Sequence, residues 1–518
     1  MKFLINRYLM LLFALLALTT VPRQAAAQTD IRTTYQNEAP SEVGGVAGLS
    51  AGNQMPKQLV NTSPAGFPDA VCNDESPAAF YFRPYTGSEN ANRWIIVLQG
   101  GGDCGDDQSC SRRWFAEDTL LPGFGSNSMS AVNLPDAING NGVLERVGQN
   151  PMGDWNHVLI HYCSSDRWTG TSRSDVVAYF PPVPLSNRSY QRADPWVTHQ
   201  QPGGGDVRMR LPFLGRKIVD AVTDTLRRAG PDGTLRYRGS PLPNLDDAEA
   251  VVLAGGSAGG LGVINNLDHL SSYLRQHHTP CPTNATCPFL VAGISDSAFP
   301  PLLQNVDLNG TPGCVTLIKC TWDEQMDYSV RTGRHRMWGA RGDASCEAWH
   351  AAMDPLHPNH PDHIARCADE GYVLTNHVTS RIFVRMGQED SLLAGYYQSL
   401  HVQSPVGVAL TTPEFARLVR DQSRALANVT TTGMENAFPV TPFVFPIHTA
   451  PGAFVPTCAE HDTLLQTKQV FGVTIRNGDP PPPVSHLRLF AVVRAWLQGG
   501  GGPSILVAED AAHDHCVP

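Results

Sequence analysis

Short, almost wholly apolar runs recur through the middle of this chain, separated by amphipathic stretches. The runs span 93–99, 157–163, 250–254, 289–295 and 381–386. Continuous apolar runs of this length are typical of strands buried on both faces, as in parallel sheets. Between them, residues 211–230 and 260–276 place apolar side chains three or four positions apart, which predicts helices. The alternation predicts an α/β fold with a mostly parallel sheet and helices on both faces.

Both ends of the chain and one internal stretch lack this pattern. Residues 28 to about 60 are polar and glycine-rich without periodicity, so we predict a flexible lead-in. The main α/β domain is predicted over 61–500, followed by a C-terminal tail at 501–518. Within the domain, about 310–370 holds four cysteines and many histidines but no strand pattern. We predict that this stretch is an inserted, disulfide-bearing cap.

The first 27 residues have the three parts of a secretory signal peptide. Lys2 and Arg7 make a positive start, residues 8–18 are apolar, and 25–27 are small alanines. The apolar part is shorter than the roughly 20 residues that a membrane span needs. We therefore predict an exported protein without a membrane span, in the periplasm or the medium. An uncleaved amino-terminal anchor is the alternative.

The charge pattern excludes two classes of partner. The formal net charge is −10, only 17% of residues are charged, and no basic run occurs. Such a chain offers nothing to attract nucleic acid or an anionic membrane surface. We expect a monomer.

Twelve cysteines, an even number, follow the predicted signal peptide. In an oxidising compartment this number predicts up to six disulfides. Close spacing suggests four local pairs, Cys104–Cys110, Cys281–Cys287, Cys314–Cys320 and Cys346–Cys367. Cys72, Cys163, Cys458 and Cys516 remain for long-range bridges. Because no C-x-x-C spacing occurs, we expect no metal site, and no motif implies a cofactor.

A serine stands among glycines where one buried run ends. The sequence GGSAG at 255–259 is a G-x-S-x-G motif with a strand before it and a helix after it. A strand that turns directly into a helix leaves no room for side chains beside the turn, so small residues are needed. The turn would hold Ser257 at the helix N-terminus, exposed as a nucleophile. The alternative is an ordinary tight turn with a capping serine.

A serine nucleophile needs a basic histidine and an orienting carboxylate. In α/β-hydrolase order the acid follows the second strand after the nucleophile helix, where Glu389 and Asp390 lie. Asp296 follows the first strand, so we predict a supporting role for it. The candidate bases are His448, His461, His513 and His515. Spacing alone favours His461 only slightly over the tail pair.

An oxyanion formed at Ser257 needs backbone N–H donors, and glycines follow another predicted strand. The run VLQGGGDC at 97–104 places Gly100, Gly101 and Gly102 there. We predict that the amides of Gly101, Gly102 and Ala258 form an oxyanion hole. The alternative is a flexible surface loop, but a Cys104–Cys110 disulfide would restrain it.

With these pieces in order, the chain resembles the pectin acetylesterase / Notum family of α/β-hydrolases. The blocks that carry the resemblance are CNDESPAAFYF (72–82), LQGGGDC (98–104), YCSSDRWTGT (162–171), GGSAGGLGVINNLD (255–268), ISDSAF (294–299), MGQEDSLL (386–393) and PTCAEHDTL (456–464). The resemblance implies an α/β-hydrolase catalytic domain over 61–500 with Ser257 as nucleophile, Asp390 as acid and His461 as base. It also implies oxyanion donors at Gly101, Gly102 and Ala258, and disulfides Cys72–Cys163 and Cys458–Cys516. Family members often carry an aromatic residue in the oxyanion loop, whereas this chain has Gly102 and then Asp103.

The resulting hypothesis is a secreted serine carboxylic-ester hydrolase with a Ser-His-Asp triad. The resemblance implies a substrate that is an acylated polysaccharide such as pectin, with acetyl the expected group, or an acylated protein serine. Two alternatives remain. One is a catalytically silent member of the fold that binds carbohydrate or protein. The other is a metal-dependent hydrolase built on His513, Asp514 and His515, which lack a scaffold in the predicted tail.

Overall fold

The computed structural model describes most of the chain between residues 52 and 516. The described residues are 52–114, 129–132, 134–180, 205–228, 236–237, 240–241, 243–278, 289–299, 334–353, 367–399, 410–426, 451–477, 485–499, 505–509 and 514–516. The chain divides into two units, Met1–Glu38 with Val177–Met209, and Ala39–Val176 with Arg210–Pro518. The first unit's described residues, 177–180 and 205–209, lie in the paired strands β6 (Ser172–Phe180) and β7 (Gly205–Phe213). The second unit contains the main sheet.

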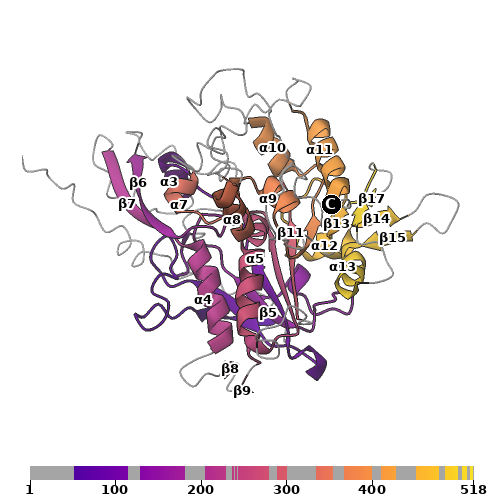
Figure 1. Ribbon diagram of the computed structural model, residues 1–518, viewed down its shortest axis with the longest axis horizontal. Coiled ribbons are helices and arrows are strands. Elements are labelled where there is room, and N and C mark those ends of the chain that lie inside the picture. The colour runs from indigo at the N-terminus through magenta and orange to yellow at the C-terminus, as the bar shows by residue number, and fades with distance from the viewer. Residues whose placement is uncertain are drawn as a thin grey trace, which may run out of the picture. The chain divides into compact units, whose positions relative to one another are not determined.

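Ten strands form that sheet, in the order β16-β13-β12-β11-β10-β3-β5-β2-β1-β4 (Figure 1). From β16 to β5 every neighbouring pair is parallel, whereas β2, β1 and β4 add antiparallel pairs at one side. The strands are β1 (Gln54–Leu59), β2 (Ala79–Arg83), β3 (Arg93–Leu98), β4 (Ala137–Asn139), β5 (Asn156–Ile160), β10 (Ala250–Gly256), β11 (Leu290–Asp296), β12 (Arg381–Arg385), β13 (Gly452–Val455) and β16 (Ile505–Val507). This mostly parallel sheet with helices is an α/β-hydrolase fold, as the sequence predicts.

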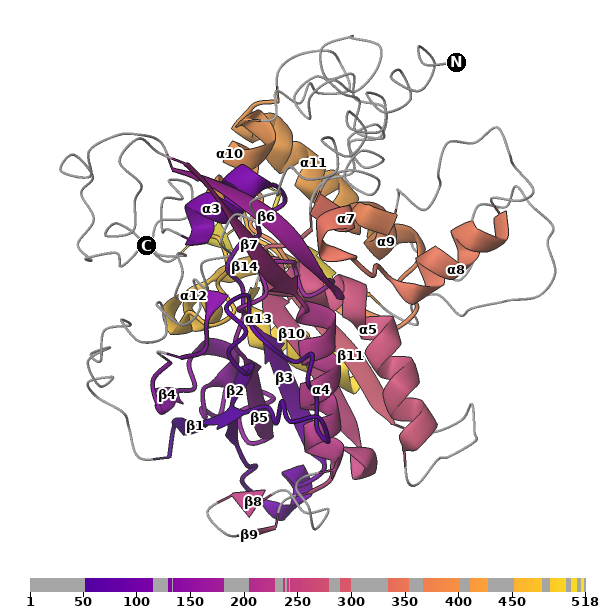
Figure 2. The ribbon, with the colours of Figure 1, turned by 90° about the vertical axis from the view of Figure 1, so that its left-hand side faces the viewer.

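Helices cover both faces because alternate residues of each central strand point to opposite sides. On one face, Ile96 and Leu253 join the core formed with α4 (Gly215–Arg228) and α5 (Ala258–His277). On the other, Val252 joins α12 (Thr467–Gly472) and α13 (Leu489–Gln498). Figure 2 shows α4 and α5 running along the central strands. The apolar runs lack period-two alternation because both strand faces are buried.

The remaining described elements are short or lie beside this core. They are α3 (Asp107–Trp114), α7 (Arg334–Trp338), α8 (Ala344–Met353), α9 (Glu370–Asn376), α10 (Ser391–Ser399), α11 (Thr412–Ala425), β8 (Arg236–Tyr237), β9 (Ser240–Pro241), β14 (Thr474–Asn477), β15 (Ser485–Arg488), β17 (Asp514–His515) and the 3₁₀ turns η1 (Ser88–Asn90), η3 (Gly142–Leu144) and η6 (Leu245–Asp247). Within the stretch predicted as a cap, 310–370, the described residues include helices α7 and α8. No described helix is long and apolar enough to cross a membrane.

The structure differs from the prediction in the lead-in and in the C-terminal tail. Residues 54–59 of the predicted lead-in form β1, which pairs with β2 and β4. Its sequence contains a proline, and only Met55 is buried, so no apolar pattern marks it. In the predicted tail, 505–507 extend the sheet as β16, and 514–515 pair with β14. Strands of two or three residues are too short to show periodicity. The predicted helix at 211–230 begins later, at Gly215, because 211–213 belong to β7.

Four disulfides join described cysteines: Cys72–Cys163, Cys104–Cys110, Cys346–Cys367 and Cys458–Cys516. They are the two local and two long-range pairs that the sequence and the resemblance indicate. No described cysteine is free. Cys281, Cys287, Cys314 and Cys320 lie outside the described residues.

Candidate active site

Ser257 lies at the junction between β10 and α5, where the chain turns sharply. Its backbone has φ 54° and ψ −126°, a conformation that non-glycine residues adopt rarely. The Ser257 amide donates to the Asp296 carbonyl at the end of the neighbouring strand β11, over 2.9 Å. The side chain makes no capping hydrogen bond with the helix. The turn therefore places the hydroxyl at the carboxyl edge of the sheet without tying it to the helix end.

The glycines around Ser257 are required by close backbone contacts. A β-carbon on Gly255 would meet the carbonyl oxygens of Gly259 and, at 2.9 Å, Leu98. One on Gly259 would also clash with Leu98, which ends β3. Strand β10, helix α5 and strand β3 thus pack so closely here that only hydrogen fits. This geometry is the physical reason for the small residues of the motif.

The structure brings Asp390 and His461 together. His461 Nδ1 lies 2.8 Å from Oδ2 and 3.0 Å from Oδ1 of Asp390, which is fully buried. Glu389, the other candidate acid, is exposed. The two loops that carry this pair are joined by backbone hydrogen bonds, Gln388 N–H to the Pro456 carbonyl and Ser391 N–H to the Ala459 carbonyl.

His461 is held in a strongly anionic environment. Burial by itself lowers the pKa of its imidazole, but the hydrogen bond to Asp390 and the charges of Asp390, Asp462 and Asp296 outweigh burial and raise it above 6.5. Its Nε2 atom is buried and makes no hydrogen bond within the described part of the chain. The bond from the Ser257 hydroxyl to this nitrogen is therefore not formed here. In enzymes without substrate this contact is often long and tightens in the complex.

Asp462 is a site residue that the sequence analysis missed. Its carboxylate lies in the space that a β-carbon on Gly100 or Gly256 would fill, and the Gly100 position is 2.5 Å from Oδ2. The same Gly100 position is 3.1 Å from the β-carbon of Ser257, so Asp462 lies beside Ser257. Burial and the charge of Asp296 raise the pKa of Asp462 to about 6. The only sequence signal is its place directly after the candidate base.

Asp296 holds the loop that follows His461. Its fully buried carboxylate accepts hydrogen bonds from the amides of Thr463 at 2.7 Å and Leu464 at 2.8 Å. It also forms an ion pair with Arg385 at 3.1 Å. These contacts match the supporting role predicted from strand order. They fix the loop that carries the candidate base His461, called the base loop below, over the end of β11.

The predicted oxyanion loop is tied to neighbouring segments on both sides. Trp168 Nε1 donates to the Gln99 carbonyl at 3.1 Å, and Trp338 Nε1 donates to the Cys104 carbonyl at 2.7 Å. Gly101 and Gly102 have φ values of 148° and 66°. Among the described residues, neither glycine amide donates to another backbone carbonyl. A restrained loop whose amides donate to no other backbone group is suited to stabilise a developing negative charge by hydrogen bonds.

Asp103, the departure from the family pattern, belongs to a buried ionic network. Arg167 pairs with Asp103 and, at 3.2 Å, with Glu370 at the start of α9. The side chains of Arg167 and Glu370 are only 12% and 7% exposed, so solvent screens this network little. The network links the predicted oxyanion loop, which contains Gly101 and Gly102 and is called the glycine loop below, to the segment between β11 and β12.

Other predicted candidates lie elsewhere. His448 and His513 fall outside the described residues. His515 belongs to β17, which pairs with β14, and Cys516 is bonded to Cys458 three residues before His461. The tail therefore returns toward the base loop through a disulfide.

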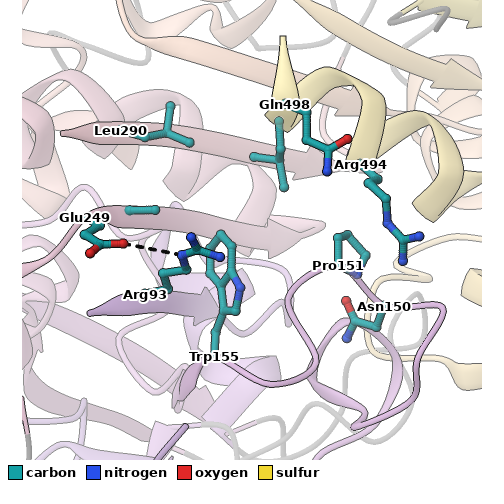
Figure 3. Close-up of a pocket in the computed structure, with 10 residues that line it drawn as sticks. Arg93, Asn150, Pro151, Trp155, Glu249, Leu290, Arg494 and Gln498 are labelled. Atoms are coloured by element: carbon teal, nitrogen blue, oxygen red, sulfur yellow. Dashed lines mark ion pairs between the residues drawn. The ribbon is translucent and has the colours of Figure 1, made fainter. Parts of the chain in front are cut away.

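A cavity of about 540 Å³ lies at the opposite edge of the sheet from Ser257 (Figure 3). Arg93 and Leu290, the first residues of β3 and β11, line it together with Trp155. An ion pair of 3.6 Å joins Arg93 to Glu249. In open α/β sheets ligands bind at the carboxyl ends of the strands, so this cavity is not the candidate active site.

Comparison with known proteins identifies similar chains. A family model described as pectinacetylesterase matches residues 50–180, and palmitoleoyl-protein carboxylesterase NOTUM of Homo sapiens is 28% identical over 276 residues. The NOTUM protein of Drosophila melanogaster is 30% identical over 245 residues. The chain is similar to members of the pectinacetylesterase / Notum family over these parts. The family model covers the glycine loop but not Ser257, Asp390 or His461.

The matches to Notum proteins are partial in sequence and extensive in fold. The alignments cover 53% of this chain and 41% of human NOTUM, and 46% of this chain and 27% of the Drosophila protein. A solved structure of the Wnt deacylase Notum from Drosophila aligns with a TM-score of 0.52 at 21% identity. That alignment covers 88% of this chain and 97% of the other. The similarity of structure shows that the fold is shared.

Proposed function

We propose that this protein is an exported serine carboxylic-ester hydrolase that acts through an acyl-enzyme. The observation that carries the proposal is the Asp390–His461 pair beside the strained Ser257 turn, at the carboxyl edge of the sheet. Relatives named as carboxylesterases support the same chemistry. Export is supported by the disulfides and by the signal peptide expected at residues 1–27.

In the proposed mechanism, Ser257 Oγ attacks the ester carbonyl while His461 Nε2 takes the hydroxyl proton. Asp390 holds the Nδ1 proton and so keeps Nε2 available as the base. The amides of Gly101, Gly102 and Ala258 stabilise the oxyanion. His461 then protonates the leaving alcohol, and water activated by the same imidazole hydrolyses the acyl-enzyme.

The proposed substrate is an acyl ester, with acetyl on a polysaccharide such as pectin as the expected case and an acylated protein serine as the second. The family description pectinacetylesterase supports the first, and the relatives' name, palmitoleoyl-protein carboxylesterase, supports the second. A chain-length series of p-nitrophenyl esters, run beside acetylated pectin and acetylated xylan, separates them. A maximum at acetyl supports the polysaccharide substrate, whereas a maximum at long acyl chains supports the protein substrate.

Ser257→Ala provides the direct test of the activity. We expect the variant to lose p-nitrophenyl acetate hydrolysis and labelling by a fluorophosphonate probe. Ser88→Ala, in the exposed turn η1, is the matched control and should retain both. Equal labelling and turnover in Ser257→Ala and wild type would overturn the proposal. A wild-type chain inert on every acyl ester would instead favour the catalytically silent alternative.

A further inference from the structure

A second cluster of reactive side chains, outside the candidate active site, involves residues of α8 and the end of α9. Cys346 and His350 are four residues apart in α8, so they share one face of the helix. His377 ends α9. One ligand atom from each of these three residues lies within 4.8 Å of the others, and all three are buried.

The fourth member of the cluster is Cys367, which is bonded to Cys346. Its sulfur lies 2.01 Å from that of Cys346. The set contains two sulfur and two imidazole ligands, the composition of a structural zinc site. Zinc ligands lie about 3.3–3.7 Å apart in a tetrahedral site, so the two sulfurs would have to separate once their bond is broken, and the imidazoles would have to approach them.

One histidine of the cluster, His377, lacks a hydrogen-bond partner among the described residues. Both ring nitrogens of His377 are buried without a hydrogen bond to any described residue. His350 Nε2 lies 3.3 Å from the Tyr372 hydroxyl, and the ring centroids of His350 and His377 are 5.6 Å apart. Buried polar atoms are satisfied in the great majority of cases, so an unsatisfied pair of nitrogens points to a missing partner such as a metal ion.

We propose that reduction of the Cys346–Cys367 disulfide converts this cluster into a zinc site formed by Cys346, Cys367, His350 and His377. A dithiol supplies two electrons and two protons, breaks the sulfur–sulfur bond and becomes a cyclic disulfide. Zinc then displaces the two thiol protons as both thiolates bind. The disulfide and the metal are alternative cross-links of the same segments, so α8 and α9 stay joined in either redox state. The sequence spacing conceals the site because its ligands are C-x₃-H and C-x₉-H.

Cobalt substitution in the full chain tests this proposal. The Cys458→Ser/Cys516→Ser background removes the other described group of cysteines with metal-ligand spacing. After reduction with a phosphine, one equivalent of Co²⁺ should produce thiolate charge-transfer absorption and the visible bands of a tetrahedral ion, and zinc should abolish both. The oxidised chain should show neither. His350→Gln/His377→Gln should lose the signal, while His277→Gln, on the exposed end of α5, should keep it.

X-ray absorption on the zinc-loaded, reduced background protein decides the case independently of how the histidine variants fold. We expect two sulfur and two nitrogen ligands. A shell of four sulfurs, a shell without sulfur, or the absence of tight zinc binding after reduction would overturn the proposal.

Discussion

The carboxylate of Asp462 occupies the space that a β-carbon on Gly256 would fill. A glycine of the nucleophile turn is therefore required by a side chain from the base loop, some two hundred residues later. This contact joins the turn that carries Ser257 to the loop that carries His461. The proposed mechanism needs these two segments held at a fixed distance from each other. It also explains why Gly256 has to be small, apart from the needs of the strand-to-helix turn.

We expect Gly256→Ala to displace Asp462 and to destabilise the protein by about 1–3 kcal/mol, as overpacked interiors do. Esterase activity should fall with it, because the base loop moves relative to Ser257. Gly395→Ala in α10 is the control, since a β-carbon there meets nothing within 4 Å. It should stabilise the helix by up to about 1 kcal/mol. Denaturant unfolding and p-nitrophenyl acetate kinetics measure both effects.

Asp390→Asn should lower kcat by about 10⁴-fold, because an amide in place of the carboxylate favours the wrong tautomer of the histidine. Glu389→Gln changes the neighbouring, exposed carboxylate and should leave kcat unchanged. A full loss of activity in Glu389→Gln with a normal Asp390→Asn variant would reverse the assignment of the acid. Steady-state kinetics on folded protein, checked by circular dichroism, gives the answer.

The value of kcat/KM should fall on the acid side of the pH profile, with its midpoint at the pKa of His461. That pKa lies above the ordinary 6.5 of histidine. The base must be neutral, so activity is lost as pH decreases through that pKa. Asp462→Asn removes a negative charge that raises this pKa. The acid limb of the variant should therefore move to lower pH. Asp421→Asn, on the exposed surface of α11, should not move it; a limb unchanged in Asp462→Asn would contradict the electrostatic link.

Arg167→Ala should destabilise the protein by about 3–5 kcal/mol, because Glu370, whose side chain is only 7% exposed, loses the arginine that compensates its charge. Arg417→Ala removes an arginine that also pairs with two carboxylates, but its side chain is 45% exposed. That control should cost less than about 1 kcal/mol. Similar losses in the two variants, measured by urea unfolding, would show that the Arg167 network is not effectively buried.

Local pattern was enough to predict the central part of the fold. The runs at 93–99, 250–254 and 289–295 became β3, β10 and β11, since strands buried on both faces must be apolar throughout. The same patterns do not mark β1 or β16. Their residues are ordered by pairing with partners distant in the chain, and a strand with one buried side chain or three residues carries no period.

The sequence by itself determined the position of the Ser257 turn and the central strands of the sheet. It also determined two cysteine pairs that are close in the chain, Cys104–Cys110 and Cys346–Cys367. It offered Glu389 or Asp390, and several histidines, as partners for the serine. Tertiary structure decided that Asp390 faces His461 and that Asp462 fills the space beside Gly256. The physical reason is that a nucleophile turn is made by contiguous residues. The meeting of Asp390 with His461 depends instead on how parallel strands place their carboxyl ends along one edge.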